Sequence, residues 1–405
     1  MLQQAIIQKI LDSQKKKIWK LGNGFQREIL PYLPALKSKV LVVSGIRRCG
    51  KNTLIKQLLA LETHEILFLS FDDPRLSNFE LSDFETLDKI IENSKSEILF
   101  FAEIHLIKGW EVYVRKKLDE GFRIAITSSN VLFLSSEFGI KLTGRYVGKE
   151  FFTFSYREFL KFKSLENNAK SLQKYIDNGS FPEFLKTNNT DILTDLFNDI
   201  LNRCIIARYG IRDVRAFKNL VVYLISNVGN RVTANKLLQM LGIKTAATVL
   251  EYFSFLEDSY LLYFMPKFSY SSKVQMVNPR KVYVIDGGMV KIAANSFSDN
   301  RDKILENTIY LELRRGGKSL YYFDENDSEC DFVVMQDEKF EQLIQVCYEL
   351  LPENREREMR GLREAMSFFQ TDKGKIITFN QRDSYIDKGN IIEIVPAWEW
   401  LKFKV

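Results

Sequence analysis

The segment GIRRCGKNTL, residues 45 to 54, holds the first side chains whose types and spacing suit a chemical task. A glycine, four intervening residues, a second glycine and then a lysine match a loop whose backbone N–H groups surround phosphate oxygens, while the lysine neutralises the β and γ charges. The candidate nucleotide-binding residues of this segment are Gly45, Arg48, Gly50, Lys51, Asn52 and Thr53, and Ser129 joins them from a later strand end. The segment therefore predicts binding of ATP or another phosphate ligand; a chance glycine-rich turn is the competing interpretation.

The metal-binding half of this pattern is altered. Such loops normally offer a serine or threonine hydroxyl to Mg²⁺ directly after the lysine, and Asn52 stands there instead. The strand-end acid that holds the ion through water is expected before Glu103 in EILFFAEIH, and that position is Ala102. Glu103 itself stands where a general base orients the attacking water. We therefore assign no metal ligand and expect weakened Mg²⁺ binding, although Asp72 or Asp73 at a neighbouring strand end could assist the ion.

Two further positions suit nucleotide sensing. Ser129 and Asn130 end the segment RIAITSSN, where a polar side chain can contact the γ-phosphate or the attacking water; ordinary helix capping is the alternative. Arg145, in KLTGRY, is a candidate catalytic arginine that would complete the site of a neighbouring subunit. A structural salt bridge is the competing interpretation for Arg145.

The C-terminal part of the chain contains a second set of side chains in a chemically suggestive order. A metal-dependent nuclease needs a helix glutamate, a strand-end aspartate and an E-x-K on the next strand, so that carboxylates hold Mg²⁺ and the lysine activates water. Here the order is Glu306, Asp331, Gln345 and Cys347. Because an amide replaces the acid and a thiol replaces the lysine, we do not expect nuclease activity.

The elements that must position these residues alternate between strands and helices. Apolar segments at KVLVV, EILFLSF, EILFF and RIAITSS each end in polar or acidic residues, and helical patterns are expected from about Lys51 to Leu61, from Asp83 to Asn93 with Ser82 as N-cap, and from Trp110 to Glu120. This alternation predicts an α/β fold: a parallel sheet of the P-loop NTPase type with helices on both faces.

Two more modules are expected after this sheet. The segment RVTANKLLQMLGIKTAATVLEYFSFLEDSYLL predicts a helix, a turn, a second helix and a strand, which is typical of a winged helix-turn-helix. Lys244 is its only obvious cation, so a helical packing module that never meets DNA is the alternative. The expected domains are 1–165 for ATP binding, with an N-terminal helix over 1–35, then 166–290 for the winged-helix module and 291–405 for the nuclease-like α/β module.

Composition restricts the remaining choices. The 405 residues are 45% hydrophobic, which indicates a globular chain of two or three domains. The net charge of +6 permits contact with nucleic acid without demanding it. The four scattered cysteines and two histidines predict neither a zinc site nor disulfides, and the N-terminal segment is too polar for a signal peptide or membrane span. We expect a soluble protein of the reducing cytoplasm.

The chain resembles a family of prokaryotic AAA-type ATP-binding proteins whose C-terminal domain, of uncharacterised function, is related to the PD-(D/E)xK nucleases. The segments that carry the resemblance span nearly the whole chain: GIRRCGKNTLIKQL, LSFDDPRL, LFFAEIHLIKGWEVYVRKKLDEG, ITSSN, LTGRY, FFTFSYREFL, DNGSFPEFL, TANKLLQMLGIKTAATVLEYFSFLEDSYLL, KVYVIDGGM and ENTIYLELRRGGKSLYYFDENDSECDFVV. The resemblance implies ATP binding, with Lys51 on the phosphates, Glu103 as the surviving member of the acidic pair, Ser129 near the sensor position and Arg145 in a finger-like position.

The function that we expect is a nucleotide-gated switch with impaired Mg²⁺-dependent hydrolysis. An active ATPase, a DNA-associated protein with a degenerate nuclease-like domain, and an interaction scaffold with a vestigial loop are the alternatives. The expected partners are ATP, with nucleic acid, a second copy of the chain or another protein as further candidates, and no membrane.

Overall fold

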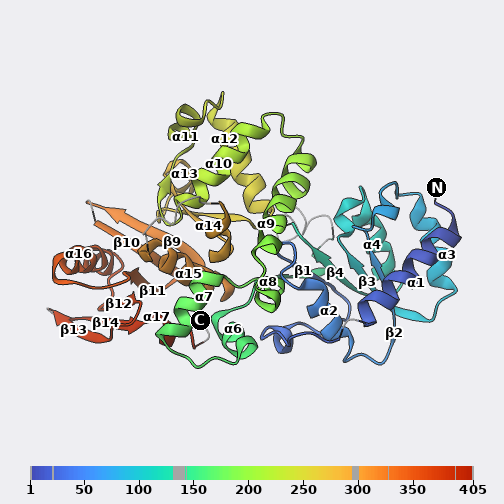
Figure 1. Ribbon diagram of the computed structural model, residues 1–405, viewed down its shortest axis with the longest axis horizontal. Coiled ribbons are helices and arrows are strands. Elements are labelled where there is room, and N and C mark those ends of the chain that lie inside the picture. The colour runs from blue at the N-terminus through green and yellow to red at the C-terminus, as the bar shows by residue number, and fades with distance from the viewer. Residues whose placement is uncertain are drawn as a thin grey trace. The chain divides into compact units, whose positions relative to one another are not determined.

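The computed structural model describes residues 2–403, apart from residues 21, 131–141, 143, 294–300, 327 and 388. The chain divides into two compact units, Met1–Phe151 and Phe152–Val405. Each unit is described by itself below, and Figure 1 shows the elements of both.

The first unit is built on a five-stranded sheet in which every strand pair is parallel, as the alternating pattern predicts. The strand order is β2-β3-β4-β1-β5, so the strand before the glycine-rich loop lies between β4 and β5. The strands are β1 (Val40–Ser44), β2 (Glu65–Ser70), β3 (Ser96–Ala102), β4 (Arg123–Ser128) and β5 (Tyr146–Glu150). In a parallel sheet all carboxyl ends meet at one edge, which brings the ends of β1, β3 and β4 together.

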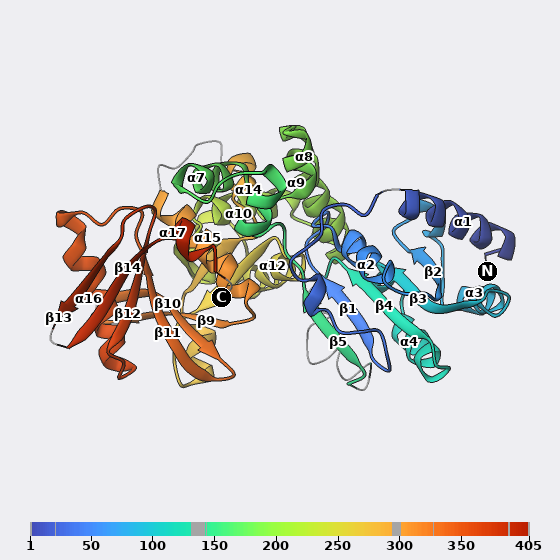
Figure 2. The ribbon, with the colours of Figure 1, turned by 90° about the horizontal axis from the view of Figure 1, so that it is seen from below.

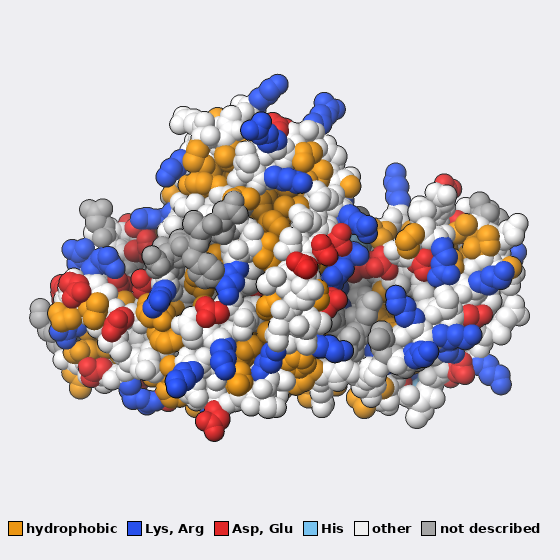
Figure 3. Space-filling view, in the orientation of Figure 1, with side chains coloured by type: hydrophobic (Ala, Val, Ile, Leu, Met, Phe, Trp, Pro, Cys, Tyr) orange, Lys and Arg blue, Asp and Glu red, His pale blue; other side chains and the backbone are white. Residues whose placement is uncertain are grey.

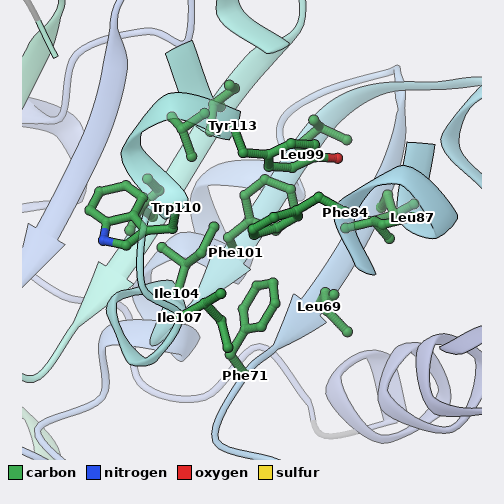
Figure 4. Close-up of a cluster of buried hydrophobic side chains, with 14 of the residues drawn as sticks. Leu69, Phe71, Phe84, Leu87, Leu99, Phe101, Ile104, Ile107, Trp110 and Tyr113 are labelled. Atoms are coloured by element: carbon green, nitrogen blue, oxygen red, sulfur yellow. The ribbon is translucent and has the colours of Figure 1, made fainter. Parts of the chain in front are cut away.

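Helices cover both faces of this sheet (Figure 2). Helices α3 (Asp83–Glu92) and α4 (Trp110–Asp119) pack on one face, where alternate strand residues form an apolar core with Phe84 and Tyr113 stacked at 3.9 Å (Figure 4). Helix α2 (Lys51–Leu59) buries Leu54 and Ile55 on the other face. Short 3-10 turns lie at Leu30–Tyr32, Pro74–Leu76 and Ile104–Leu106.

Two local expectations in this unit need correction. Helix α1 spans Gln4–Lys20 and ends well before residue 35, because Gly22 and Gly24 follow it and Gly24 has a φ of +64°, which is incompatible with helix. Ser82 precedes α3 but its side chain caps nothing. At the start of this helix it is the Asp83 carboxylate that accepts hydrogen bonds, from the backbone N–H of Leu2 and, at 2.8 Å, from that of Glu80.

The second unit begins with helices and ends with a mixed sheet. Its helices are α6 (Tyr156–Lys163), α7 (Ala169–Asn178), α8 (Pro182–Thr187), α9 (Thr190–Asp199), a π-helical turn (Ile200–Ala207), α10 (Val214–Ser226), α11 (Ala234–Leu241), α12 (Ala246–Asp258), α13 (Ser272–Val277), α14 (Gly287–Ala293), α15 (Arg301–Arg315), α16 (Pro352–Phe368) and α17 (Ala397–Trp400). A three-stranded antiparallel sheet has the order β6-β8-β7, with β6 (Arg231–Val232), β7 (Leu262–Pro266) and β8 (Arg280–Val284).

The predicted helix, turn, helix and strand of this unit are α11, Gly242 with its positive φ, α12 and β7. The six-stranded sheet has the order β13-β14-β12-β11-β10-β9. Its strands are β9 (Ser319–Glu325), β10 (Ser328–Gln336), β11 (Lys339–Val346), β12 (Lys373–Thr378), β13 (Asp383–Asp387) and β14 (Asn390–Pro396). The pairs among β11, β12 and β14 are parallel and the others are antiparallel.

Candidate nucleotide-binding site

The glycine-rich loop joins the end of β1 to the start of α2, the strand, loop and helix context that the motif requires. Arg48 and Gly50 have positive φ values of 62° and 101°, so the loop has left-handed backbone at two positions directly before the helix. Gly45 is needed for a different reason. A Cβ atom there would lie 1.9 Å from the carbonyl oxygen of Phe151, which follows β5.

Lys51 is buried at the first position of α2 and its ammonium group lies against the loop. Its Nζ donates hydrogen bonds to the carbonyl oxygens of Gly45 at 2.8 Å and Ile46 at 3.0 Å. It also lies 3.9 Å from Oε1 of Glu103, at the end of β3. The predicted phosphate lysine and the predicted general base therefore meet at the same edge of the sheet.

Glu103 is held in one orientation. Its backbone is left-handed, with a φ of 54°, and its Oε2 accepts hydrogen bonds from the backbone N–H of Ser129 at 2.9 Å and from the Ser129 hydroxyl at 2.8 Å. Burial raises the pKa of the Glu103 carboxyl, but the charges of Lys51 and His105 and the hydrogen bonds from Ser129 lower it more. The net pKa lies below the ordinary value, so the carboxylate form is favoured. Ser129, predicted as a sensor, binds the base directly.

The two altered metal positions also meet, at Thr127 of β4. The Oδ1 atom of Asn52 accepts a hydrogen bond from the Thr127 hydroxyl at 2.8 Å, and Ala102, which is fully buried, pairs with Thr127 in the β3–β4 register. A cation between these positions would find one amide oxygen that already has a donor, and a methyl group. Since Mg²⁺ requires several oxygen ligands, these residues do not fit the ion.

A cavity of about 540 Å³ lies beside the first turn of α2. Asn52 and Thr53 line it from α2, and Asp72 and Asp73 line it from the segment after β2. The Asp73 carboxylate pairs with the Arg75 guanidinium at 2.7 Å, and this hydrogen-bonded pair holds the pKa of Asp73 well below its ordinary range. Asp72 accepts a hydrogen bond from the Ser70 hydroxyl at 2.5 Å. The two acids predicted to assist a metal therefore share a cavity with Asn52, but Asp73 already has a cation.

Some contributors to this site were missed in the sequence. His105 Nδ1 lies 3.1 Å from the Ser128 hydroxyl and 3.5 Å from Oε2 of Glu103. Arg27 donates to the carbonyl oxygen of Cys49 at 3.0 Å and lies over the Phe151 ring. The contribution of His105 could have been predicted, because it follows Glu103 by only two residues. Arg27 precedes the loop by many residues and only the fold brings it there.

Arg145 lies away from this group. Its carbonyl oxygen accepts the backbone N–H of Val40, the first residue of β1, which places Arg145 at the edge of the sheet opposite the loop, roughly 15 Å along the strand. Its side chain is 39% exposed and pairs with Asp119 at 2.5 Å. The structure thus brings Lys51, Glu103 and Ser129 together and leaves Arg145 outside this chain's own site.

The second predicted set, in the C-terminal unit, is also assembled. Glu306 of α15 and Asp331 of β10 are buried and both contact the ammonium of Lys281, at 3.0 and 2.6 Å. The Gln345 side chain accepts the backbone N–H of Asp331 at 3.0 Å. Cys347 is turned toward the carbonyl oxygen of Glu349, at 3.1 Å. Within the described part of the chain, no group of three or more His, Cys, Asp or Glu side chains is arranged to hold a metal ion.

The family comparisons agree with the geometry of the first unit. The model of a family described as AAA domain matches residues 37–160, and that of a domain of unknown function (DUF8612) matches residues 169–300. The strand order, the glycine-rich loop after β1 and the acid after β3, together with the first match, define a P-loop protein of the AAA class. Such a domain implies nucleotide binding, typically with Mg²⁺.

The chain is 32% identical over 436 residues to the uncharacterized protein MJ1544 of Methanocaldococcus jannaschii, covering 99% of this chain and 95% of that protein. It belongs to the same family as this archaeal protein. An uncharacterized protein of Haemophilus influenzae is 28% identical over 334 residues, covering 77% of this chain and 83% of that protein.

Among solved structures, the RuvB Holliday junction branch migration motor of Thermotoga maritima is 17% identical, with a TM-score of 0.30, covering 63% of this chain and 89% of that one. PCH-2 of C. elegans is 15% identical, with a TM-score of 0.28, covering 40% of this chain and 50% of that one. TM-scores of this size carry no argument about the present chain. Along the described residues, no helix is both long and apolar enough to cross a membrane.

Proposed function

We propose that the N-terminal unit binds ATP and that nucleotide occupancy, with little or no Mg²⁺-dependent hydrolysis, sets the state of the protein. The observation that supports this most directly is the environment of Lys51. Its ammonium donates to two loop carbonyl oxygens and lies near Glu103, at the edge where backbone N–H groups of the loop and of the first turn of α2 face a ligand. When a phosphate binds, the Lys51 ammonium would exchange these neutral carbonyl acceptors for charged phosphate oxygens, which form stronger hydrogen bonds.

The proposed contacts follow from position. Gly45, Arg48 and Gly50 shape the loop, Lys51 pairs with the phosphates, and Thr53 donates from the first turn of α2. Asn52 occupies the metal position without serving as a ligand, because its amide oxygen binds Thr127. Glu103 and Ser129 form a hydrogen-bonded pair, and a γ-phosphate bound near Lys51 would disturb these hydrogen bonds. This disturbance is the event that we propose couples nucleotide binding to the rest of the chain.

Calorimetric titration of ATP, with and without Mg²⁺, tests the proposal. We expect binding whose affinity changes less than about tenfold on addition of Mg²⁺, because the donor set does not fit the ion. The Lys51→Ala variant should lose binding, whereas Lys116→Ala, at an exposed position of α4, should keep it. No heat in either condition for the native sequence would refute ATP binding.

An active ATPase is the second candidate, and one observation favours it. Asp72 and Asn52 line the same cavity, so an ion held by the phosphates could reach the Asp72 carboxylate through water. Asp73 is less suited because Arg75 already neutralises it. Asp72→Asn would then lower phosphate release strongly and Asp73→Asn would not.

Arg145 acts, in this proposal, only on a second copy of the chain, since it lies at the opposite sheet edge of its own unit. We propose that α11, α12 and the β6-β8-β7 sheet form a winged-helix module, and that Glu306 of α15 with Asp331 of β10 marks a nuclease-like relation. Support for DNA contact is slight. Helix α12 contains two glutamates, an aspartate and no lysine or arginine. On the face drawn in Figure 3, outside its grey atoms, Lys and Arg are interspersed with Asp and Glu.

A further inference from the structure

A lysine ammonium occupies the centre of the carboxylate cluster in the C-terminal unit. Lys281, in strand β8, is 1% exposed. Its Nζ lies 3.0 Å from Glu306 Oε1, 2.6 Å from Asp331 Oδ1 and 2.6 Å from Glu329 Oε1. An ammonium group has three N–H donors, so each donor has its own carboxylate.

The carboxylates of the two buried acids have further hydrogen-bond partners. Glu306 Oε1 accepts the Tyr283 hydroxyl at 2.6 Å, and its Oε2 accepts Nζ of Lys303 at 2.7 Å. Asp331 Oδ2 accepts the backbone N–H of Val346 at 2.9 Å. Two buried negative charges are therefore fixed in place by donors, and they converge with Glu329 on one point.

Oxygen atoms of three carboxylates are also what a divalent cation needs, but in the described part of the chain these three are arranged around the ammonium and form no metal-binding group. Three carboxylate oxygens surround the ammonium at 2.6 to 3.0 Å. Oxygen ligands lie at about 2.1 Å from Mg²⁺ and about 2.3 to 2.6 Å from Ca²⁺, so these oxygens would have to move inward, by roughly half an ångström or more for Mg²⁺ and by less for Ca²⁺, before they could serve as metal ligands. The third and fourth residues of the predicted set do not compete, because Gln345 and Cys347 bind other groups.

We propose that Lys281 is a built-in counter-ion that takes the place of a divalent metal, so that the carboxylates join β8 to α15 and β10 and the C-terminal unit binds no catalytic ion. This inference does not depend on nucleotide binding in the first unit. It assigns Lys281 a positioning role and excludes it as a nucleophile, since an amine that is fully paired as ammonium has no free electron pair. In agreement, burial lowers the pKa of Lys281 but the three carboxylates raise it more, to a net value well above normal.

Binding of Mn²⁺ to the nucleotide-free protein, followed by electron paramagnetic resonance, tests the proposal. Lys281→Met removes the charge and keeps most of the side-chain volume, so that Asp331 loses its ammonium partner and Glu306 keeps only Lys303. Lys303→Met is the matched control, because Lys303 also pairs with Glu306 but contacts no other acid of the cluster and is 25% exposed. A second variant, Lys281→Met with Glu329→Gln, removes one charge of each sign and guards against failure of the first to fold.

The native protein and Lys303→Met should take up no Mn²⁺ at this cluster. Lys281→Met, or the double variant, should gain one site per chain that is at least about tenfold tighter than any site of the native protein, and Mn²⁺ should raise its melting temperature. Two results would overturn the proposal: folded Lys281 variants that gain no Mn²⁺ site, or a native protein whose Mn²⁺ site is lost on Glu329→Gln.

Discussion

Restoring the two altered metal positions is the sharpest perturbation of the first unit. In the variant Asn52→Thr with Ala102→Asp, a hydroxyl and a carboxylate replace an amide and a methyl group on either side of Thr127. Both new groups lie at the carboxyl edge of the sheet that also holds Lys51 and Glu103. If the base is intact and only the metal is missing, this change should restore hydrolysis.

The expected changes in stability and in hydrolysis rate follow from the structure. Losing the hydrogen bond between Asn52 and Thr127 costs about 1 kcal/mol, and an unpaired carboxylate at the fully buried position 102 costs more than the about 1–3 kcal/mol of a neutral polar group. The variant should therefore be less stable than the native protein, and Mg²⁺ with ATP should recover much of the loss. A metal that stabilises the transition state by about 3 kcal/mol raises the rate roughly a hundredfold.

Phosphate release at saturating ATP, measured across a Mg²⁺ titration, gives the answer. Ala102→Asn in the Asn52→Thr background is the control, since it has the shape of aspartate without its charge and should gain little. A gain below about threefold in a folded double variant with unchanged ATP affinity would refute the reasoning. It would mean that Asp72 already supplies what the altered positions lack.

Three further outcomes are expected. Lys281→Met should lower the free energy of unfolding by about 3–5 kcal/mol in urea titrations, against about 1 kcal/mol for Lys303→Met, because the first leaves buried carboxylates uncompensated. Burial raises the pKa of Asp286 to about 6 from 3.8, so the folded state binds the extra proton and stability relative to Asp286→Asn should fall by about 3 kcal/mol as pH rises from 3 to 7; a constant difference would contradict this. Arg145→Ala and Asp119→Ala remove the same exposed pair and should each change stability by less than about 1 kcal/mol, and neither should alter ATP affinity measured by calorimetry.

The sequence predicts the first unit well because its signals are local. Each strand is a short apolar segment, each helix has its own period, and the loop lies between β1 and α2, so the sheet edge and the meeting of Lys51 with Glu103 follow from topology. Strands β13 and β14 were missed. Strand β13, DSYID, is short and mostly polar, and its Ile386 is exposed at the edge of the sheet, so no apolar face marks it. Strand β14, NIIEIVP, does bury Ile392 and Ile394 in alternation, and that signal was overlooked.

Tertiary encounters could not be predicted in the same way. The hydrogen bond between Asn52 and Thr127 joins residues 75 positions apart, and no local sequence pattern at either position predicts it. Gly45 was predicted as a phosphate-binding residue. The carbonyl oxygen of Phe151 is by itself close enough to exclude a side chain at this position. Lys281 is the second residue of strand β8, whose sequence is RKVYV. A lysine near the start of such a strand normally indicates an exposed strand end. Its burial depends on acids from α15 and β10 that only the fold assembles.

The two units share one chemical property, which links their separate proposals. In each, the place where a divalent ion would be expected holds protein groups that do not need one: an amide and a methyl group beside Thr127, and an ammonium among three carboxylates. If both proposals are right, ATP in the first unit is neutralised by Lys51, the loop N–H groups and the positive end of α2. Those groups are fixed before ATP arrives, whereas a metal would have to be delivered with it. Nucleotide affinity should then depend little on the Mg²⁺ concentration and only weakly on ionic strength, because salt screens a buried ammonium such as that of Lys51 much less than an exposed one.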